Sequence, residues 1–322
     1  MNVPPALSGK PVNSTSITTG QRARRLLELI RFSHTIFALP FACLAALLAL
    51  RLPLADGTQV TITWWTAIGL ILCMVFARSA AMAFNRLVDQ TYDAANPRTA
   101  GRHLPAGLLS RAEVIGFTLF CAVGFIASCG LFLPNWLPLA ASVPVLIFLC
   151  GYSLAKRFTS LAHLWLGIAL SLAPICVWVA IRGESLLAAP AEWMPSVVLA
   201  IAVALWVTGF DIIYACQDET FDRHVGLRSI PARLGARRAL HVAACLHMLM
   251  IFALLLLPQT TNGLGLGVLY YGAIGLIAAL LIYEHRLVKP DDLQRVNDAF
   301  FNVNAVISIV LLIAAGIDCW VI

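Results

Sequence analysis

Long apolar runs separated by short polar segments make up nearly the whole of this chain. Nine of these runs approach or exceed the length of about 20 residues that an α-helix needs to cross a bilayer. They are too long for ordinary strands and do not alternate between apolar and polar positions, so a β interpretation fails. The pattern predicts an all-α, polytopic membrane protein with nine transmembrane helices in one bundle. The predicted spans lie near residues 34–51, 62–84, 112–133, 137–155, 161–181, 194–214, 239–257, 264–283 and 300–321.

The amino-acid composition agrees with this pattern and divides the chain into two parts. The 322 residues are 60% hydrophobic and 12% charged, whereas soluble domains average about 25% charged residues. Residues 1–24 differ from the rest because Pro4, Pro5 and Gly9 favour turns, and we predict a disordered cytoplasmic arm there. Residues 25–322 would then form a single membrane domain.

The basic residues are distributed unevenly between the predicted loops. Nineteen lysines and arginines fall on one side of the membrane, whereas only Arg51 and Arg182 fall on the other. Cytoplasmic loops carry the excess of basic residues. We therefore expect a multi-pass protein of the inner membrane with its N-terminus and its long polar loops in the cytoplasm. Topology also explains the net charge of +6 without a nucleic-acid partner.

Two acidic motifs, each at the end of a predicted span, carry the candidate chemistry. The first contains Asn85, Asp89 and Asp93 at intervals of four residues, and the second contains Asp218 and Asp222 at the same interval. This spacing places the side chains on one face of a helix. Neighbouring carboxylates repel each other unless a cation lies between them, and Mg²⁺ bridging to phosphate oxygens suits such a pocket. The implied ligand is a diphosphate.

The two motifs are expected to meet over one cavity that opens to the cytoplasm. Four predicted spans separate them, an even number, so both lie at the same membrane face. A weak repeat supports this arrangement, because Arg102-His-Leu-Pro-Ala follows the first motif and Arg228-Ser-Ile-Pro-Ala follows the second. A duplicated four-helix unit would place a site at the interface between the repeats.

Further residues extend this chemistry. Lys156 and Arg157 end the fourth predicted span on the same face. A diphosphate there would meet the compact charge of the Lys156 ammonium and the planar, bidentate guanidinium of Arg157. Metal and basic residues together stabilise a diphosphate leaving group. An apolar interior could hold an isoprenoid tail, and aromatic faces could shield the carbocation that forms. Asp211 is a candidate base, or would orient the acceptor hydroxyl. The aromatic residues near the motifs are Phe84, Tyr92, Trp206, Phe210 and Tyr214.

With these motifs the chain resembles the UbiA superfamily of intramembrane prenyltransferases over roughly residues 25–320. The segments 96–107 and 221–231 are similar to its 4-hydroxybenzoate polyprenyltransferase-like branch, part of which prenylates 1,4-dihydroxy-6-naphthoate on a route to menaquinone. The resemblance implies Mg²⁺, a polyprenyl diphosphate donor and an aromatic acid acceptor. The acceptor that we expect is 4-hydroxybenzoate, with 1,4-dihydroxy-6-naphthoate as the alternative.

The resemblance also assigns roles to individual residues. Independently of the resemblance, Arg31 or another cation at the cytoplasmic face is a candidate for binding the carboxylate of the acceptor. The predicted metal ligands are Asp89, Asp93, Asp218 and Asp222. The residues predicted to contact the diphosphate are Asn85, Tyr152, Ser153, Lys156 and Arg157.

Other interpretations of the same residues stay open at this point. A secondary transporter would share the repeat and the acidic residues within the membrane, but it would place them near the midplane rather than at one face. Prenylation of a haem or a chlorophyll fits the same motifs. Acidic residues at the ends of spans can simply be solvated. The histidines in apolar runs, among them His163 and His247, favour packing within the bundle over metal binding.

Overall fold

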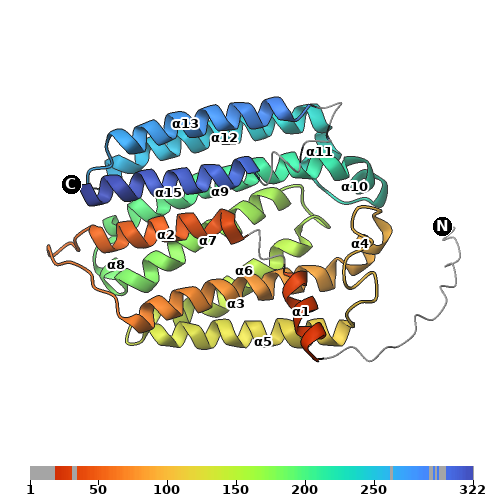
Figure 1. The fold of residues 1–322 in the computed structure, drawn as a ribbon, viewed down its shortest axis with the longest axis horizontal. Helices are drawn as coiled ribbons and strands as arrows, with labels where there is room; N and C mark the ends of the chain where they lie inside the picture. The colour runs from red at the N-terminus through yellow and green to blue at the C-terminus, as the bar shows by residue number, and fades with distance from the viewer. Residues whose placement is uncertain are drawn as a thin grey trace, which may run out of the picture.

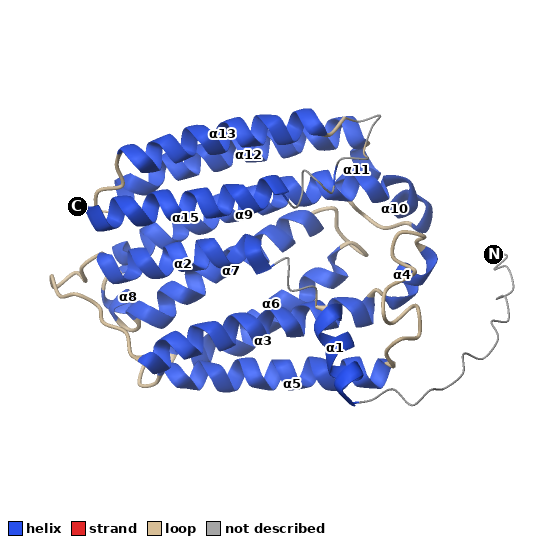
Figure 2. Ribbon diagram, in the orientation of Figure 1, coloured by secondary structure: helices blue, strands red, loops and turns tan. Residues whose placement is uncertain are grey.

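Every regular element that the structure describes is a helix (Figures 1 and 2). The computed structural model describes residues 19–30, 35–261, 264–289, 293, 296 and 302–321. The long helices run side by side along the long axis of the molecule in Figure 1. They are α2 (Thr35–Arg51), α3 (Trp64–Val88), α5 (Arg111–Cys129), α6 (Leu137–Ala155), α7 (Ala162–Arg182), α9 (Met194–Ala215), α12 (Ala236–Thr260), α13 (Val268–Leu287) and α15 (Asn304–Val321).

Seven of the described helices are long and apolar enough to cross a membrane. They are α3, α5, α6, α7, α9, α12 and α13, with α5 and α9 extended by the short helices next to them. The helices α2 and α15 are apolar as well, but shorter within the described residues. The prediction of an all-α, multi-pass membrane protein is therefore confirmed, whereas the count of nine spans stays a prediction.

Short helices gather at the two ends of the bundle. The helices α4 (Gln90–Ala95), α10 (Glu219–Val225) and α11 (Ile230–Leu234) lie together at one end, and α8 (Ser185–Ala188) lies at the other (Figure 1). Two 3₁₀ turns, η3 (Pro190–Trp193) and η4 (Cys216–Asp218), flank α9, and a third, η2 (Gly130–Phe132), follows α5. The end of the bundle with α4 and α10 therefore carries both acidic motifs.

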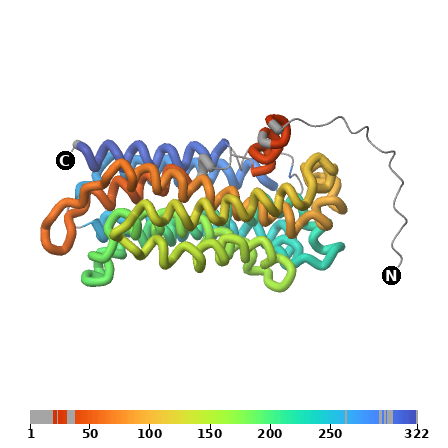
Figure 3. The backbone as a smooth tube through the Cα atoms, turned by 90° about the horizontal axis from the view of Figure 1, so that it is seen from below, coloured from red at the N-terminus to blue at the C-terminus, as the bar shows by residue number. Residues whose placement is uncertain are grey.

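The N-terminal helix α1 (Thr19–Leu29) crosses the ends of the long helices and is visible in Figure 3 away from the main bundle. Its residue Leu29 packs with Ala83 and Leu87 of α3, while its arginines lie on the exposed side. This helix begins within the range 1–24 that the sequence predicts as a disordered arm, and its Leu26 and Leu29 pack on an apolar surface of the folded chain. Residues 1–18 lie outside the described part.

The helix α9 lies at the centre of the largest core. It packs between α7 and α12, and its side chains Leu199, Trp206 and Ile213 are fully buried. The same core takes in apolar side chains of α2, α13 and α15. The helices α3, α5 and α6 pack on the other side of α7 and contribute few residues to this core. The bundle thus has a dense half around α9 and a looser half around α3.

A buried polar network ties α9, α13 and α15 together inside the dense half. The Trp206 indole donates a hydrogen bond to the Asn304 side-chain oxygen over 2.7 Å. The Asn304 amide donates to Glu284 over 2.9 Å. All three residues are fully buried. Polar groups without water satisfy one another in this way or carry a large desolvation penalty.

Asn304→Leu should therefore lower the stability of the bundle. It leaves the Trp206 N–H and one Glu284 oxygen without these partners, at a cost of about 1–3 kcal/mol for each buried group. Thermal unfolding in detergent measures the effect as a lower midpoint temperature. The matched control is Val306→Leu, because Val306 lies on the same helix and is 45% exposed. Equal midpoints for the two variants would show that the network contributes nothing to stability.

Candidate active site

A cavity of about 650 Å³ runs through the looser half of the bundle. One face of α3 lines it over almost the whole helix, from Leu70 through Ala77 and Asn85 to Asp89, at intervals of three and four residues. At a rise of 1.5 Å per residue this face is about 28 Å long, close to the thickness of the hydrocarbon core of a bilayer. The helices α5, α6, α7 and α9 supply the other walls.

The two ends of the cavity differ in chemistry. Leu70, Met74 and Phe132 line one end, and the middle is walled mostly by alanine, leucine and valine. Ten polar residues gather at the end nearest α4 and α10. They are Asn85, Asp89, Asp93, Asn96, Arg98, Arg102, Lys156, Arg157, Asp218 and Asp222. A long apolar body with one ionic end suits an amphiphile with an anionic head group.

The first acidic motif straddles a break between two helices. The helix α3 ends at Val88, Asp89 caps it, and α4 begins at Gln90. The backbone hydrogen bonds from Asp89 to Asn85 and from Asp93 to Asp89 keep the spacing of four residues across the break. The Asn85 side chain donates to the Asp89 carboxylate over 2.8 Å. The sequence predicts one unbroken face, whereas the structure reorients the chain at Asp89.

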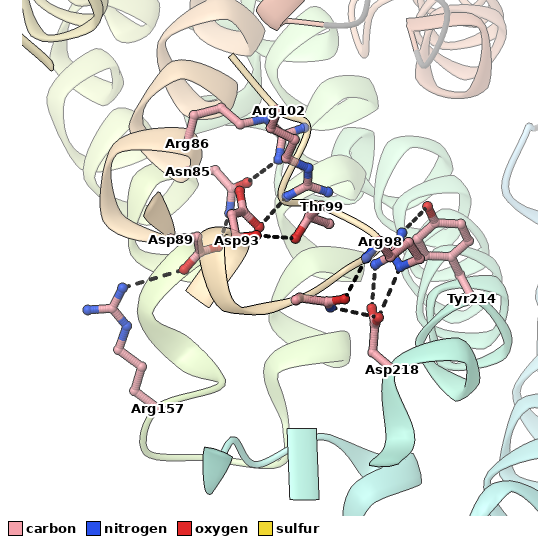
Figure 4. Close-up of polar contacts among 11 residues, drawn as sticks. Asn85, Arg86, Asp89, Asp93, Arg98, Thr99, Arg102, Arg157, Tyr214 and Asp218 are labelled. Carbon is pink, nitrogen blue, oxygen red and sulfur yellow. Dashed lines mark hydrogen bonds and ion pairs between the residues drawn. The ribbon is translucent and has the colours of Figure 1, made fainter. Parts of the chain in front are cut away.

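The second motif also straddles a break. The helix α9 ends at Ala215, the turn η4 carries Asp218, and α10 carries Asp222. The Asp218 carboxylate lies against the loop that follows α4 (Figure 4). It accepts hydrogen bonds from the Asn96 amide over 3.1 Å and from Arg98 Nε over 3.0 Å. These contacts join the two acidic motifs, as the sequence predicts.

Every one of the four motif carboxylates pairs with a cation from another segment. The Asp93 carboxylate accepts a hydrogen bond from Arg102 over 2.6 Å. The Asp218 carboxylate pairs with the Nε and Nη2 atoms of the Arg98 guanidinium. Arg157 Nη2 lies 3.4 Å from Asp89, on the opposite side from Asn85 (Figure 4). Lys156 Nζ lies 3.7 Å from Asp222. Burial and the neighbouring Asp93 carboxylate both raise the pKa of Asp89 above its usual range.

The donor set fits a hard divalent cation. The Oδ2 atoms of Asp93 and Asp222 are buried and accept no hydrogen bond from the described residues. Anionic oxygens without donors are the ligands that such cations prefer. Within the described residues, however, no three acidic, histidine or cysteine side chains form a preassembled metal cluster. A cation held here would take its remaining ligands from the diphosphate oxygens, because Mg²⁺ is usually bound by one or two carboxylates together with phosphate groups of the substrate.

Asp211, on α9, lines the cavity and is held from behind by a histidine. The His163 Nδ1 atom, on α7, lies 2.6 Å from the Asp211 Oδ2 atom. The Asp211 side chain is 20% exposed and the His163 side chain is fully buried. The other ring nitrogen of His163 accepts a hydrogen bond from the Ile230 backbone N–H over 3.3 Å.

Arg78 is a cation within the membrane-spanning part of α3 that lines the cavity. Its Nε atom is buried and has no hydrogen-bond partner among the described residues. It lies seven residues, about 10 Å of helix, from Asn85 towards the apolar end. A charge inside a span is costly and usually serves a substrate or a partner.

The structure gathers most of the residues that the sequence nominates. All four predicted metal ligands, the five predicted diphosphate contacts and Asp211 line the one cavity. Arg31 lies outside the described residues, so its role stays a prediction. Of the aromatic candidates, Tyr92, Phe210 and Tyr214 line the cavity. Trp206 is fully buried in the core instead.

Sequence reasoning missed Arg98, Asn96, Arg78 and His163 as site residues. Arg98 connects Asp218 with the Tyr214 hydroxyl, which it contacts over 2.9 Å. The repeat nominates Arg102 and Arg228 as equivalent, but they differ. Arg102 binds Asp93, whereas the Arg228 side chain donates to the Phe158 carbonyl over 2.8 Å. Charged or polar residues inside apolar runs were the available signal for Arg78 and His163.

Comparison with known proteins identifies the class. The model of the UbiA prenyltransferase family matches residues 52–306. A 4-hydroxybenzoate octaprenyltransferase of Aeromonas hydrophila is 30% identical over 75% of this chain and 80% of that protein. The apo structure of a UbiA homolog from Aeropyrum pernix K1 is 32% identical, with a TM-score of 0.76 over 89% of this chain and 98% of that chain.

A more distant structure shares the fold. It is a UbiA homolog from Archaeoglobus fulgidus bound to DMAPP and Mg²⁺, 18% identical with a TM-score of 0.65 over 94% of this chain and 100% of that chain. Fold and site thus define a membrane-embedded prenyltransferase. The chain belongs to the UbiA prenyltransferase family, so the resemblance seen in the sequence motifs is confirmed.

Asp93→Asn and Asp222→Asn should each weaken binding of a divalent cation by about tenfold or more, because the number of charged ligands sets the affinity of such sites. Electron paramagnetic resonance of Mn²⁺, titrated in the presence of inorganic diphosphate, measures this directly. Asp56→Asn is the control, since Asp56 lies in an exposed loop well separated in sequence from both motifs. Affinity equal to that of the wild type in both site variants would remove these carboxylates from the metal site.

Proposed function

We propose that this protein transfers a polyprenyl group from polyprenyl diphosphate to 4-hydroxybenzoate in a Mg²⁺-dependent reaction. The observation that carries the proposal is a single cavity with a long apolar body and an ionic end that holds both acidic motifs. The name of the similar Aeromonas hydrophila protein supports the choice of acceptor. The alternative acceptor, 1,4-dihydroxy-6-naphthoate, gains no support from the relatives.

The donor lies along the cavity with its diphosphate at the ionic end. Lys156 and Arg157 follow α6 and are placed to contact the phosphate oxygens, with Asn85, Tyr152 and Ser153 as further polar contacts. Ser153 is buried and lines the cavity next to Tyr152, as expected of a polar contact for a ligand. Bound Mg²⁺ would neutralise the diphosphate and make it a better leaving group.

The acceptor lies between the donor head and the apolar body. Its carboxylate needs a cation, and Arg78 supplies one at a position that only a group inside the cavity can reach. A guanidinium fork matches a carboxylate in a bidentate geometry. This assignment places the ring of the acceptor between Arg78 and the ionic end.

The transfer can be followed through the chain's own residues. The bond between the prenyl C1 atom and oxygen breaks, and the diphosphate leaves with the electron pair towards Lys156 and Arg157. The aromatic faces of Phe210 and Tyr214 line the wall beside the allylic carbocation, which such faces stabilise. A ring carbon of the acceptor forms the new bond to C1. Asp211 then takes the ring proton, as a general base that lines the same wall.

A secondary transporter fits the structure less well. Its acidic groups would lie near the middle of the membrane beside interrupted helices. Here α3 runs unbroken from Trp64 to Val88, and both helix breaks lie at the ends of spans. We also propose nine spans, with α2 and α15 completing the bundle, and an ionic end that faces the cytoplasm, on the strength of the arginine distribution.

The experiment that tests the function is prenyl transfer by the purified protein in detergent, with Mg²⁺ and a polyprenyl diphosphate. The two acceptors, 4-hydroxybenzoate and 1,4-dihydroxy-6-naphthoate, are supplied in separate tubes. We expect prenylated product from 4-hydroxybenzoate. Product from the naphthoate alone would reassign the acceptor, and no product from either, with the donor intact, would refute the proposed reaction.

Asp89→Ala and Asp218→Ala should each abolish this turnover while the protein still inserts and folds, because each removes a carboxylate from the ionic end. Product formation and circular dichroism measure the two properties. Glu219→Gln is the matched control, since Glu219 is adjacent to Asp218 but pairs with Arg223 outside the cavity. Activity at the level of the wild type in either alanine variant contradicts the role given to that residue.

Arg78→Gln should raise the KM for 4-hydroxybenzoate about 10- to 100-fold, the equivalent of a lost charged hydrogen bond. It should leave the KM of the donor unchanged. The KM for the neutral analogue 4-hydroxybenzamide should rise far less in this variant, because the analogue has no carboxylate for Arg78 to bind. Arg51→Gln is the control, since Arg51 lies outside the lining of the cavity. An equal rise in KM for 4-hydroxybenzoate and for 4-hydroxybenzamide would exclude a contact between Arg78 and the carboxylate.

A further inference from the structure

A buried histidine behind Asp211 is the group that the proposed reaction leaves unexplained. His163 is fully buried on α7, and its Nδ1 atom lies 2.6 Å from the Asp211 Oδ2 atom. His163 does not line the cavity, whereas Asp211 does. The substrates can therefore meet only one member of this pair. Any effect of His163 on the reaction has to pass through Asp211.

A second hydrogen bond fixes the state of the imidazole. The Ile230 backbone N–H donates to His163 Nε2 over 3.3 Å, so this nitrogen has to be the unprotonated one. A neutral imidazole then carries its proton on Nδ1 and donates it to Asp211. Protonation of Nε2 would set two N–H groups against each other. With Nε2 as the acceptor, the Nδ1 N–H is the donor that faces the carboxylate.

The segment that supplies the Ile230 N–H is itself anchored next to the diphosphate contacts. The Arg228 backbone N–H donates to the Lys156 carbonyl over 2.7 Å. The Arg228 side chain reaches the Phe158 carbonyl, and Arg233 lies 3.3 Å from the Ser160 hydroxyl. The loop between α6 and α7 therefore holds α11, and α11 holds the tautomer of His163.

We propose that His163 is a positioning residue that orients the Asp211 carboxylate towards the acceptor, with Ile230 as the group that fixes the tautomer of His163. The donated hydrogen bond occupies one carboxylate oxygen and leaves the other for the proton of the ring. This inference rests on the proposed transfer to 4-hydroxybenzoate.

His163→Phe, which keeps a ring and removes both nitrogens, is the principal test. It should lower kcat by about 10- to 100-fold, a part of the 10²–10⁴-fold that a general base contributes. The KM of the donor and the affinity for Mn²⁺ should not change. His163→Asn keeps an N–H donor near the position of Nδ1 and should recover most of the lost kcat. An equal loss in the Asn and Phe variants, or full activity in the Phe variant, overturns the proposal.

A double-mutant cycle separates positioning from general damage. In an Asp211→Asn background the Phe substitution should cost no further activity, because His163 acts only through that carboxylate. If His163→Phe lowers kcat by the same factor in both backgrounds, His163 contributes only to the stability of the bundle. Should His163→Phe not fold, Ile230→Pro carries the test. Proline at the first position of a helix is tolerated and removes the N–H while the imidazole stays; unchanged kcat there also overturns the proposal.

Nitrogen-15 labelling of histidine tests the geometry without any turnover. The His163 signal, assigned by its absence in the Asn variant, should show a protonated Nδ1 and an unprotonated Nε2. The opposite tautomer overturns the inference whatever the acceptor is. Failure of the wild-type protein to prenylate 4-hydroxybenzoate, with the expected tautomer present, is a failure of the proposed function and leaves the pair intact.

Discussion

The pairing of each motif carboxylate with a cation from outside its own motif is the constraint on which the rest of the site depends. Four acidic side chains share the end of one cavity. Burial and mutual repulsion both disfavour four charged carboxylates in such a place. Arg98 and Arg102 come from the loop after α4, and Lys156 and Arg157 come from the end of α6. These cations hold the breaks after α3 and α9 against each other, so the ionic end is assembled by tertiary contacts.

The apolar body of the cavity depends on an uneven distribution of packing. The helix α9 fills the core that it shares with α7 and α12, and the buried network around Asn304 fixes that half. The helices α3, α5 and α6 pack against this half without filling it, which leaves a space along α3. A rigid half thus carries Asp211 and His163, while the facing half supplies Asp89, Asp93 and the wall along the tail.

Much of the fold follows from hydrophobic length alone, and the site follows from it in part. The apolar runs predict each long helix to within a few residues, because a helix in lipid has to satisfy its own backbone. The acidic motifs predict which end of the bundle carries charge. They do not predict the helix breaks at Asp89 and Asp218, where both carboxylates contact residues from distant parts of the chain. Nor can sequence spacing reveal that His163 lies behind Asp211, since 48 residues separate them.

The walls of the cavity owe their separation to small side chains. Five alanines line the cavity, namely Ala77 and Ala81 of α3, Ala141 of α6, and Ala169 and Ala173 of α7. The small side chains of these residues leave room between the helices. A larger side chain at any of these positions would take up part of the cavity. Substitution of single alanines in this wall can therefore change which prenyl tail the cavity accepts, while the arrangement of the helices stays the same.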